Sequence, residues 1–376
     1  MRAAAPLAAL SLLSLIALGV ACDDRSPPVV EEEPTNDLLE PPPEGQGFQF
    51  GTPEITVQPG DEQQNCYFFR VRDLLEQNGL DASKPMNLHH VQLQQSKGSH
   101  HMNIFRVRTI VQDDPATEQF EGLDPAKGPF ENVNGTGPCF VSSNWADWPL
   151  VANTQQDGTI DWKFPDGVAN KLDPDEWLML QSHYVNASTQ KTPDGFGKVL
   201  VNFWHLPDEE VVHEMGTLFA TKQSIRVCQS NPTPEFGGSC QFNSPEPVTI
   251  VGANGHFHSR GKQFDMYAWD GTSVTTPSDE ARFYESDVWD EPLMAIGDSL
   301  AQVPANGGVF YTCGFQWTPP PQEIGCTDLN EYDMTKYGTS PENTDCCYTF
   351  GPVVDRNEHC NIFVYYYPKS DDINCF

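Results

Sequence analysis

Short runs of apolar and aromatic residues recur along the chain between polar turn residues, and each run has the length of one β-strand. Many of these runs are rich in Val, Ile, Phe and Tyr, which favour strands. Nine of them stand out: 66–71, 88–93, 100–107, 177–185, 199–206, 248–251, 264–269, 309–315 and 360–367. The pattern predicts an all-β fold of antiparallel sheets packed as sandwiches.

Helical periodicity is almost absent from the chain. No window keeps a 3.6-residue apolar spacing over three turns, and one short segment, residues 71–77, is predicted to be helical. The 32 prolines and 29 glycines also disfavour long helices. Asp270-Gly271, directly after an aromatic run, predicts a two-residue β-hairpin turn.

The first 46 residues are expected to lie outside the fold. Residues 1–21 join Arg2 to a continuous apolar stretch, as a signal peptide does. The stretch ends at Cys22, which is expected either to carry a lipid, as in bacterial lipoproteins, or to follow an ordinary cleavage site. Residues 22–46 are rich in proline and acidic residues and predict a disordered tether. Both alternatives predict an exported protein of the cell envelope, the periplasm or the extracellular space.

The remaining chain is long enough for two domains. Near its middle, residues 206–210 combine Pro207 with three acidic residues. This polar segment predicts a boundary between a first domain at 47–210 and a second at 211–376. The predicted fold is therefore all-β, with two tandem antiparallel β-sandwich domains.

The net charge narrows the range of partners. With 53 acidic and 21 basic residues the chain carries a formal charge of -32, which repels nucleic acid and anionic lipid headgroups. We therefore expect no nucleic-acid partner, and contact with a membrane only through a lipid anchor. The acidic surface also disfavours anionic substrates.

The cysteines support export. Apart from Cys22 there are ten, an even number that predicts up to five disulfide bonds in an oxidising compartment. No pair has the C-x-x-C spacing of a zinc site. Seven of the ten follow residue 230, so the second domain is expected to be the more heavily cross-linked. Cys66 with Cys139 is the pairing available inside the first domain.

The histidines are the most informative residues. In the pair His256-x-His258 both side chains leave the same face of a strand and can reach one metal ion. Adjacent residues on a regular strand face opposite ways, so His100 and His101 can share an ion only where a bulge or a strand end turns one of them. His183 alone is a weak signal. Four other histidines are expected to be surface or packing residues: His89, His90, His205 and His213.

The order of these motifs resembles a known family. SHHMNIF, LQSHY, an HxH pair and EHCNIFVYYY follow one another as in the copper type II ascorbate-dependent monooxygenases, the family of peptidylglycine α-hydroxylating monooxygenase and dopamine β-monooxygenase. The resemblance covers residues 60–368 and includes NCYFFRV at 65–71 and WKFPDGVANKL before His183. It implies two jelly-roll-like β-sandwich domains that face each other across an open cleft, each holding one copper ion.

The resemblance assigns roles to individual residues. The implied ligands of the first copper, which relays an electron, are His100, His101 and His183. His256 and His258 are implied to hold the copper at which oxygen and substrate meet. Gln181, two residues before His183, also matches the family and is implied to take part in catalysis. The implied reaction inserts one atom of O2 into a C–H bond of a small substrate, with two electrons from ascorbate or a similar reductant.

Position 359 departs from the family pattern. The family has methionine there, directly before the cysteine and asparagine of the last strand, whereas this chain has His359. We expect His359 to ligate the second copper and to belong to the catalytic site. Imidazole is a harder donor than a thioether and favours the cupric state, so the change bears on oxygen activation. The alternative is that a nearby thioether such as Met334 takes this role.

The substrate-binding positions differ as well. In the peptide-amidating members an arginine and a tyrosine hold the carboxylate of the substrate, and Asn254 and Phe363 stand at those positions here. Without a bidentate cation, a carboxylate substrate is not expected. Asn361 is kept. These three residues are implied to line the substrate site, and the substrate itself is not identified.

The resemblance also bears on disulfide pairing. Cys313 and Cys360 match a bridge of the family that ties the last strand to its neighbour, and by similar logic Cys228 is expected to pair with Cys375. The four remaining cysteines of the second domain would form two more bridges of open connectivity.

Two functions follow from these observations. The first is an exported copper monooxygenase with two copper ions per chain. The second is an envelope copper-binding or electron-transfer protein on the same scaffold, which has lost hydroxylation through the change at His359. A structural sandwich without metal leaves the ordered set of histidines unexplained. The sequence predicts no oligomeric state.

Overall fold

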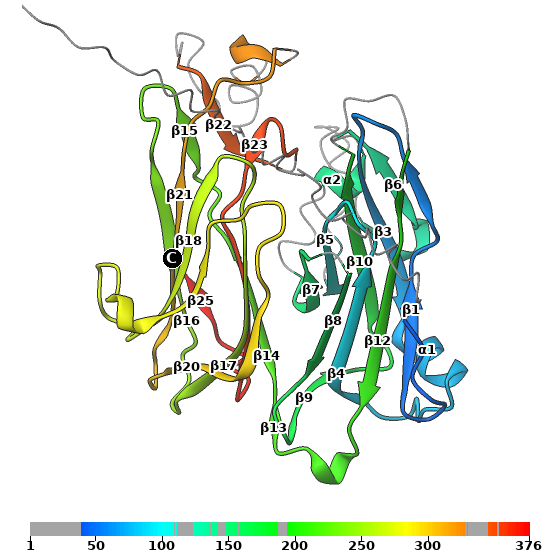
Figure 1. Ribbon diagram of the computed structural model, residues 1–376. Coiled ribbons are helices and arrows are strands. Elements are labelled where there is room, and N and C mark those ends of the chain that lie inside the picture. The colour runs from blue at the N-terminus through cyan, green and yellow to red at the C-terminus, as the bar shows by residue number, and fades with distance from the viewer. Residues whose placement is uncertain are drawn as a thin grey trace, which may run out of the picture. The chain divides into compact units, whose positions relative to one another are not determined.

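The computed structural model describes residues 39–108, 110, 123–134, 137–141, 148–156, 158–186, 194–322, 324–327, 329, 345–351 and 353–376. The predicted signal peptide, Cys22 with its predicted lipid, most of the predicted tether and Met334 lie outside the described residues. Residues from Leu39 to Phe376 belong to one unit. Most of its regular structure is strand, as Figure 1 shows, so the all-β prediction is confirmed.

The described helical segments are short. The helix predicted at 71–77 is present as α1 (Val71–Gln77), and it buries Val71, Leu74 and Leu75 at the spacing of one helical face. Others are α2 (Pro138–Val141), η1 (Pro125–Lys127), η3 (Asp208–Glu210) and η4 (Asp279–Ala281), and residues 325–327 are helical as well. Across the described segments, no helix has the length and apolar character needed to cross a membrane.

The strands up to residue 214, here called the first group, form two large sheets. One has the order β1 (Gly47–Gly51), β12 (Val199–His205), β4 (Met86–Gln95), β9 (Val168–Leu172), β13 (His213–Glu214), with β8 (Gly158–Lys163) beside β4. The other has the order β6 (Phe130–Val133), β3 (Glu62–Arg70), β10 (Trp177–Val185), β5 (Ser99–Arg106), β7 (Leu150–Thr154). A separate pair joins β11 (Gly195–Gly197) to β2 (Ile55–Val57).

The strands from Gly216 onward, here called the second group, form three sheets. The first has the order β14 (Gly216–Thr221), β24 (Asn361–Tyr367), β17 (Val248–His256), β20 (Ala295–Val303). The second has the order β15 (Arg226–Cys228), β22 (Cys347–Phe350), β23 (Asn357–Glu358). The third has the order β19 (Arg282–Ser286), β18 (Gly261–Trp269), β21 (Gly308–Phe315), β16 (Glu235–Gln241), β25 (Asn374–Cys375).

All nine predicted strand segments lie on observed strands, although β17 and β4 run further than their apolar cores. The two-residue hairpin predicted at Asp270-Gly271 is wrong, since a longer loop joins β18 to β19. The carboxylate of Asp270 accepts hydrogen bonds from the backbone N–H groups of Thr272 and Ser273, both at 2.8 Å. This side-chain turn leads the chain out of the sheet instead of reversing it.

The last residues of the predicted tether contact the first sheet. The backbone N–H of Leu39 donates to Oε1 of Gln94 at 3.1 Å, and the amide of Asn202 donates to the carbonyl of Glu40 at 2.6 Å. Among the described residues, hydrogen bonds to the fold are therefore present from Leu39 onward, ahead of the domain start expected at residue 47.

Two clusters of buried apolar side chains fill the unit. The first belongs mostly to the first group of strands, but it also takes in Val251, Met294, Phe363 and Tyr365 from the second group. The other cluster is built within the second group. Because the first core continues into the second group, the division into two tandem sandwich domains remains a prediction.

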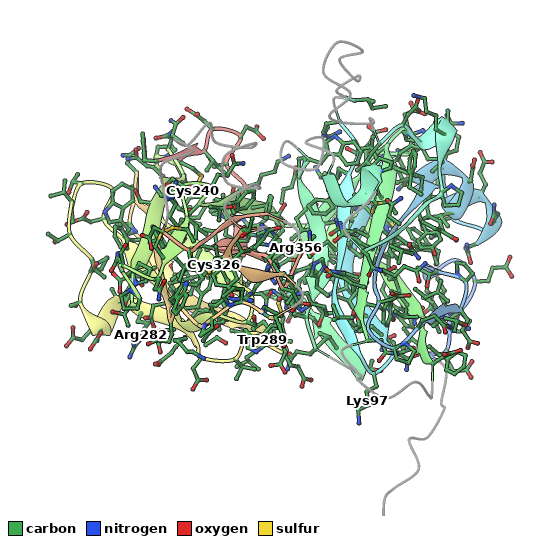
Figure 2. All side chains as sticks on the ribbon, turned by 90° about the horizontal axis from the view of Figure 1, so that it is seen from above. Lys97, Cys240, Arg282, Trp289, Cys326 and Arg356 are labelled. Atoms are coloured by element: carbon green, nitrogen blue, oxygen red, sulfur yellow. A yellow bond between two sulfur atoms is a disulfide. The ribbon has the colours of Figure 1, made fainter. Side chains whose placement is uncertain are left out.

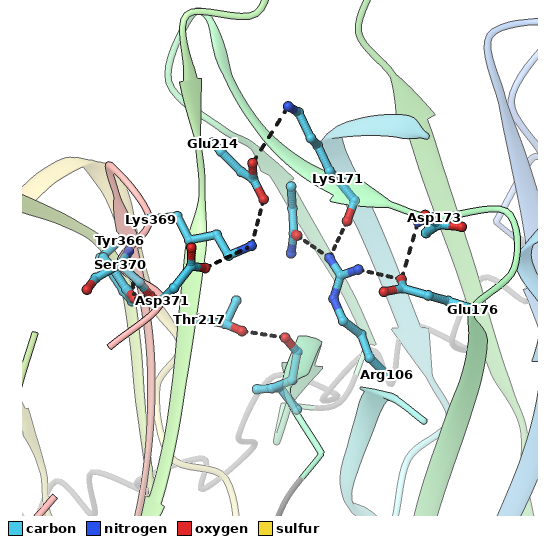
Figure 3. A network of polar contacts seen from close by, with 12 residues as sticks. Arg106, Lys171, Asp173, Glu176, Glu214, Thr217, Tyr366, Lys369, Ser370 and Asp371 are labelled. Atoms are coloured by element: carbon cyan, nitrogen blue, oxygen red, sulfur yellow. Dashed lines mark hydrogen bonds and ion pairs between the residues drawn. The ribbon is translucent and has the colours of Figure 1, made fainter. Parts of the chain in front are cut away.

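Polar contacts also join the two groups. Glu214 in β13 lies 3.6 Å from Nζ of Lys171 in β9 and 2.8 Å from Nζ of Lys369, as Figure 3 shows. Nearby, the hydroxyl of Thr217 donates to the carbonyl of Leu150 in β7. These contacts link the groups beside the chain segment that connects them.

Five disulfide bonds are described: Cys66–Cys139, Cys228–Cys347, Cys240–Cys375, Cys313–Cys360 and Cys326–Cys346. The first and fourth pair as expected, but the expected bond between Cys228 and Cys375 is wrong. Cys228 stands opposite Cys347 on paired strands, and Cys375 stands opposite Cys240. Strand register decides these pairs, and sequence spacing does not reveal it. Five disulfides are typical of proteins that fold in an oxidising compartment and agree with export.

Candidate metal centre

Six histidines from both groups of strands meet in one buried set, here called the histidine cluster: His100, His101, His183, His256, His258 and His359. The first two lie on β5, and the third lies on the neighbouring β10. The next two lie at the end of β17 and two residues beyond it, and the last lies between β23 and β24. All the residues that the sequence predicted as metal ligands therefore come together.

A β-bulge brings two adjacent histidines to one side of their strand. In the pairing of β10 with β5, His183 stands opposite His101, but the next residue, Tyr184, stands opposite Ser99. His100 is therefore an extra residue on β5, and such a residue leaves the regular alternation of side chains. The ring centroids of His100 and His101 lie 5.2 Å apart. His100 and His101 are expected to share an ion only at a bulge or a strand end, and the structure has a bulge there.

The two expected copper sites are not separated by an open cleft. The ring centroid of His100 lies 5.2 Å from that of His183 and 5.0 Å from that of His256, which belongs to the other group. The centroids of His101 and His256 are 5.1 Å apart. The cleft predicted from the resemblance is therefore wrong for this structure, because imidazoles from the two groups are in direct contact.

Two sets of three ring nitrogens lie close enough to hold a metal ion. Within each set the nitrogens lie within 4.8 Å of one another: His100, His101 and His183 in one, His100, His256 and His258 in the other. His359 lies beside the second set, with its ring centroid 4.4 Å from that of His258 and 5.1 Å from that of His256. The cluster thus offers two adjoining candidate sites that share one imidazole.

Burial keeps four of the six imidazoles neutral. Each member of the cluster is at most 8% exposed. Desolvation, reinforced by the neighbouring rings, holds the pKa of His100, His101, His256 and His258 well below the ordinary value. Trp289 packs on His100, with 5.9 Å between centroids, and Figure 2 shows it on the side of the second group that faces the first. A neutral ring keeps a lone pair for a cation.

Hydrogen bonds fix which nitrogen of two rings faces the cluster. Nδ1 of His256 donates to Oε1 of Gln155 at 2.6 Å, and Nδ1 of His258 donates to the carbonyl of Asn357 at 3.0 Å. Both rings therefore keep the lone pair on Nε2. Nε2 of His256, like Nε2 of His100, is buried without a hydrogen-bond partner among the described residues. A metal ion would satisfy these buried nitrogens, so the residues fit a bound metal.

His183 is oriented by a carboxylate. Its Nε2 lies 2.6 Å from Oε1 of Glu62, and its Nδ1 lies 3.1 Å from Nε2 of His101. Two nitrogens that bind one metal, each at about 2 Å, lie about 3 Å apart. The spacing of His101 and His183 therefore suits a shared ion as well as a hydrogen bond.

Gln181, which the resemblance implies in catalysis, contacts the cluster through Asn103. Nδ2 of Asn103 lies 2.9 Å from Oε1 of Gln181 and 3.3 Å from Nδ1 of His101. Oδ1 of Asn103 and Nε2 of Gln181 are buried without partners among the described residues. Turning both amides by half a rotation keeps their mutual bond and makes Asn103 an acceptor for His101 Nδ1. Nε2 of His101 is then free for a metal.

A small cavity borders the cluster. Its volume is about 20 Å³, which is room for roughly one water molecule. The lining combines three imidazoles with three phenyl rings: His101, His256, His359, Phe105, Phe219 and Phe363. The remaining lining residues carry amides, so no Asp, Glu, Lys or Arg in the described part of the chain borders the cavity.

Two of the three expected substrate residues line this cavity. Asn361 and Phe363 do so, and Oδ1 of Asn361 is buried without a partner among the described residues. Asn254 does not line it, and its role at the substrate site stays a prediction. Its Oδ1 accepts from Nδ2 of Asn153 at 3.2 Å, and its Nδ2 donates to the carbonyl of Leu293 at 3.1 Å. The bond from Asn153 joins the two groups, whereas the bond to Leu293 lies within the second group.

Glu358 holds two segments of the second site together. Its buried carboxylate accepts hydrogen bonds from the backbone N–H groups of His258 at 3.1 Å and Arg260 at 3.0 Å. Burial raises the pKa of Glu358 to about 7, although the guanidinium of Arg260 opposes this shift. These bonds attach the segment after β17 to the segment that carries His359.

Three of the four histidines expected to have surface or packing roles make contacts outside the histidine cluster. Nδ1 of His89 donates to the carbonyl of Val168 at 2.9 Å, and the ring of His90 stacks on Trp204. His213 packs beside Tyr367, with 5.4 Å between centroids. None of these contacts involves the histidine cluster.

Sequence reasoning missed the residues that orient the ligands: Glu62, Asn103 and Gln155. Glu62 is 121 residues from His183, and Gln155 is 101 residues from His256, so neither pair has a local signal. Asn103 does have one, since it stands two residues after His101 on β5 and shares its face.

Comparison with known proteins does not assign a family. No family model matches the chain, and no curated protein matches it. One similar solved structure is a protein from Eubacterium rectale described as secreted, with 9% identity, 80% of this chain and 73% of that chain covered, and a TM-score of 0.18. The structure of PNGF-II has 8% identity, with 88% of this chain and 61% of that chain covered and a TM-score of 0.23. The VP2 subviral particle of infectious bursal disease virus has 10% identity, with 90% of this chain and 80% of that chain covered and a TM-score of 0.17. Likenesses with such low TM-scores carry no information on function.

Proposed function

We propose that this protein is an exported, copper-dependent monooxygenase that hydroxylates a C–H bond of a small uncharged substrate with O2 and an ascorbate-type reductant. The histidine cluster is the observation that supports this proposal. Six buried imidazoles from segments far apart in the chain converge on one place. Burying polar groups is costly unless they are satisfied, and a bound metal would satisfy them.

The donor set and the motif order together favour copper. Imidazole is a suitable donor for copper, zinc, iron and nickel, and the resemblance to the ascorbate-dependent monooxygenases selects copper among them. The first ion would be held by His100, His101 and His183, and the second by His256, His258 and His359. When bound, copper supplies the one-electron and oxygen chemistry that side chains lack.

The chain itself would orient the ligands and limit the access of water. Gln155 and the carbonyl of Asn357 fix the rings of His256 and His258. The cluster is almost entirely buried, so bulk water is kept from it. Gln181 lines the cavity and would act on His101 through Asn103.

The lining of the cavity supports an uncharged substrate. Phenyl rings, imidazoles and amides line it, and none of the described lining residues is Asp, Glu, Lys or Arg. Its volume of about 20 Å³ is too small for an organic molecule. A substrate would therefore enter only when Phe219 and Phe363 rotate or when the two groups of strands move apart.

The proposal also includes the division into two domains and the lipid anchor. Sandwich domains at 47–210 and 211–376 would correspond to the two groups of strands. Cys22 would carry a lipid, and residues 22–46 would connect it to the fold.

Replacement of His258 tests the proposal. His258→Ala removes a ligand of the second site, so bound copper should fall from two ions to one per chain. Ascorbate-dependent O2 uptake should fall by about 100-fold or more, since even the loss of a residue that only orients a ligand costs about 10–100-fold. Elemental analysis and an oxygen electrode, applied to the full exported chain, give both values. His90→Ala, outside the cluster, is the matched control and should keep both. Full O2 uptake by His258→Ala would contradict the proposal.

A copper carrier or electron-transfer protein is the second candidate. The small cavity and the imidazole of His359 in place of a thioether favour it, because a third imidazole favours cupric copper. Two bound copper ions without ascorbate-dependent O2 uptake would support this candidate. Formation of a hydroxylated product coupled to O2 uptake would exclude it.

A further inference from the structure

Glu62 places a negative charge against one member of the histidine cluster. It is the first residue of β3, and its side chain is 10% exposed. Its Oε1 lies 2.6 Å from Nε2 of His183, and no other side-chain partner of this carboxylate occurs among the described residues. A carboxylate so far from water is normally paired with a cation. Here its partner is an imidazole.

The backbone of Glu62 is held in place from both sides. Its N–H donates to Oδ1 of Asn134 at 2.8 Å, and its carbonyl accepts from the N–H of Asn134 at 2.7 Å. β3 also pairs with β10 over nine residues, from Glu62 opposite Val185 to Arg70 opposite Trp177. The carboxylate therefore meets His183 from a rigid strand.

This contact selects the free nitrogen of His183. A carboxylate can only accept, so Nε2 of His183 must carry the hydrogen and donate it to Glu62. The lone pair then lies on Nδ1, which faces Nε2 of His101 at 3.1 Å. A carboxylate on the far nitrogen also makes an imidazole a stronger donor to a metal.

Other rings of the cluster have neutral partners. His256 donates to the amide of Gln155, and His258 donates to a backbone carbonyl. Glu358 lies close to the second site, but it bonds to backbone N–H groups and its charge is offset by Arg260 at 3.5 Å. The two candidate sites therefore differ in the charge behind their ligands.

We propose that Glu62 is a positioning residue that makes the metal held by His100, His101 and His183 favour the cupric state. This inference rests on the proposed function. Stronger, harder donors stabilise cupric over cuprous copper, so the first ion would have a lower reduction potential than the second. An electron from an ascorbate-type donor, taken up at the first ion, would then move spontaneously to the second.

Replacement of Glu62 by its neutral isostere tests this inference. Glu62→Gln keeps the size and an acceptor oxygen but removes the charge. For one of the two ions, the ratio of cupric to cuprous affinity should fall about tenfold. That change corresponds to a potential about 59 mV higher for a one-electron couple. The ratio is measured on metal-free full-length protein by competition with chelators specific for each oxidation state.

Glu131→Gln is the matched control. Glu131 lies on β6, next to β3 in the same sheet, and its side chain is exposed. Its replacement removes one negative charge from that sheet without touching a described histidine. The affinity ratio should therefore stay at the value of the parent protein.

The possible outcomes separate this inference from the proposed function. A parent protein that binds no copper overturns the proposed function. If the parent binds two ions and Glu62→Gln leaves the ratio unchanged, or weakens both oxidation states equally, the inference on Glu62 is overturned and the proposed function stands. If Glu62→Gln does not fold, Glu62→Asp keeps the charge but withdraws it by one methylene, and a smaller fall in the ratio is expected. An unchanged ratio in that variant also overturns the inference.

Discussion

His359 decides the donor set of the second candidate site. Its ring contacts those of His256 and His258, and the backbone on either side of it is fixed. Glu358 is bound to backbone N–H groups of the segment after β17, and Cys360 is bonded to Cys313. The side chain at this position is therefore presented to the cluster by a rigid frame, whichever donor atom it carries.

His359→Met should shift the second site toward cuprous copper. Methionine is unbranched and fills irregular spaces, so the cluster is expected to accept it. A thioether is a softer donor than an imidazole, and the ratio of cuprous to cupric affinity should rise about tenfold. Competition titrations measure this ratio, and elemental analysis should still find two copper ions. A ratio equal to that of the parent would show that His359 is not a ligand.

The sequence reveals the ligands better than the residues that orient them. His256 ends β17 and His258 follows two residues later, and this spacing in an extended segment is enough to predict that both rings face the same way. Glu62 and Gln155 are single polar residues without such a pattern. Their roles arise from strand pairing and from the contact between the two groups, which a single sequence does not display.

Among the elements, β7 has a special position, because the residues that follow it reach the other group of strands. Gln155 accepts a hydrogen bond from His256, and its Nε2 donates to the carbonyl of Gly255 at 3.1 Å. Tyr365 of β24 donates to Asn153 of β7 at 2.6 Å. The orientation of a ligand in the second group therefore depends on a strand of the first.

Gln155→Leu should weaken metal binding at His256 and His258. Leucine fills a similar volume but leaves Nδ1 of His256 without its acceptor, so metal affinity should fall about 10–100-fold. The free energy of unfolding should fall by about 1–3 kcal/mol because a buried donor, Nδ1 of His256, and a buried acceptor, the carbonyl of Gly255, lose their partner. Metal titration and urea unfolding give these values.

Gln156→Leu is the neighbouring control for that variant. Oε1 of Gln156 accepts from the backbone N–H of Met294 at 3.1 Å, so this residue also joins the two groups, but without a described contact to a histidine. Its loss should lower the unfolding free energy while leaving metal affinity unchanged. Equal losses of metal affinity in the two variants would mean that Gln155 acts only through the docking of the groups.

The local sequence pattern predicts whether a segment forms a strand or a helix. It does not predict with which other strand that segment pairs. The nine apolar runs all became strands because aromatic and β-branched residues favour a pleated, buried surface. The bulge at His100 carries no glycine or proline that would reveal it. The pairing of β25 with β16, which joins Cys375 to Cys240, links residues at opposite ends of the second group.

On the scale of the whole molecule, the junction of the two groups contains many neutral polar side chains. Imidazoles and amides meet there, together with Glu358, whose pKa is raised to about 7. Neutral forms are favoured because each charged form would lose its hydration. The pH dependence of the unfolding free energy should therefore follow the difference between the number of protons that these groups bind in the unfolded chain and in the folded chain.

The metal-free protein should lose stability as the pH falls from 7 to 5. Four histidines, at positions 100, 101, 256 and 258, have pKa values lowered well below the ordinary value by burial, so the unfolded chain binds protons that the folded chain does not. Glu358 acts in the opposite direction through its raised pKa, but it is a single group. The net difference of about three protons gives a slope of at most about 4 kcal/mol per pH unit.

Urea unfolding of the metal-free protein at pH 7, 6 and 5 measures this slope. His256→Gln should reduce it by about one proton, whereas Gln156→Leu, which removes no titratable group, should leave the slope unchanged. A free energy of unfolding that stays constant over this range would contradict the burial of neutral histidines.

The disulfide bond between Cys313 and Cys360 fixes the residue directly after His359. Thiols stay reduced in the cytoplasm and are oxidised after export, so this bond forms only once the chain has left the place of its synthesis. Before that moment, His359 lies on a segment without its link to β21. Under the proposed function, maturation would therefore have an order: secretion first, oxidation second, metal uptake last. A chain still in the cytoplasm would not present the finished centre to whichever metal is abundant there.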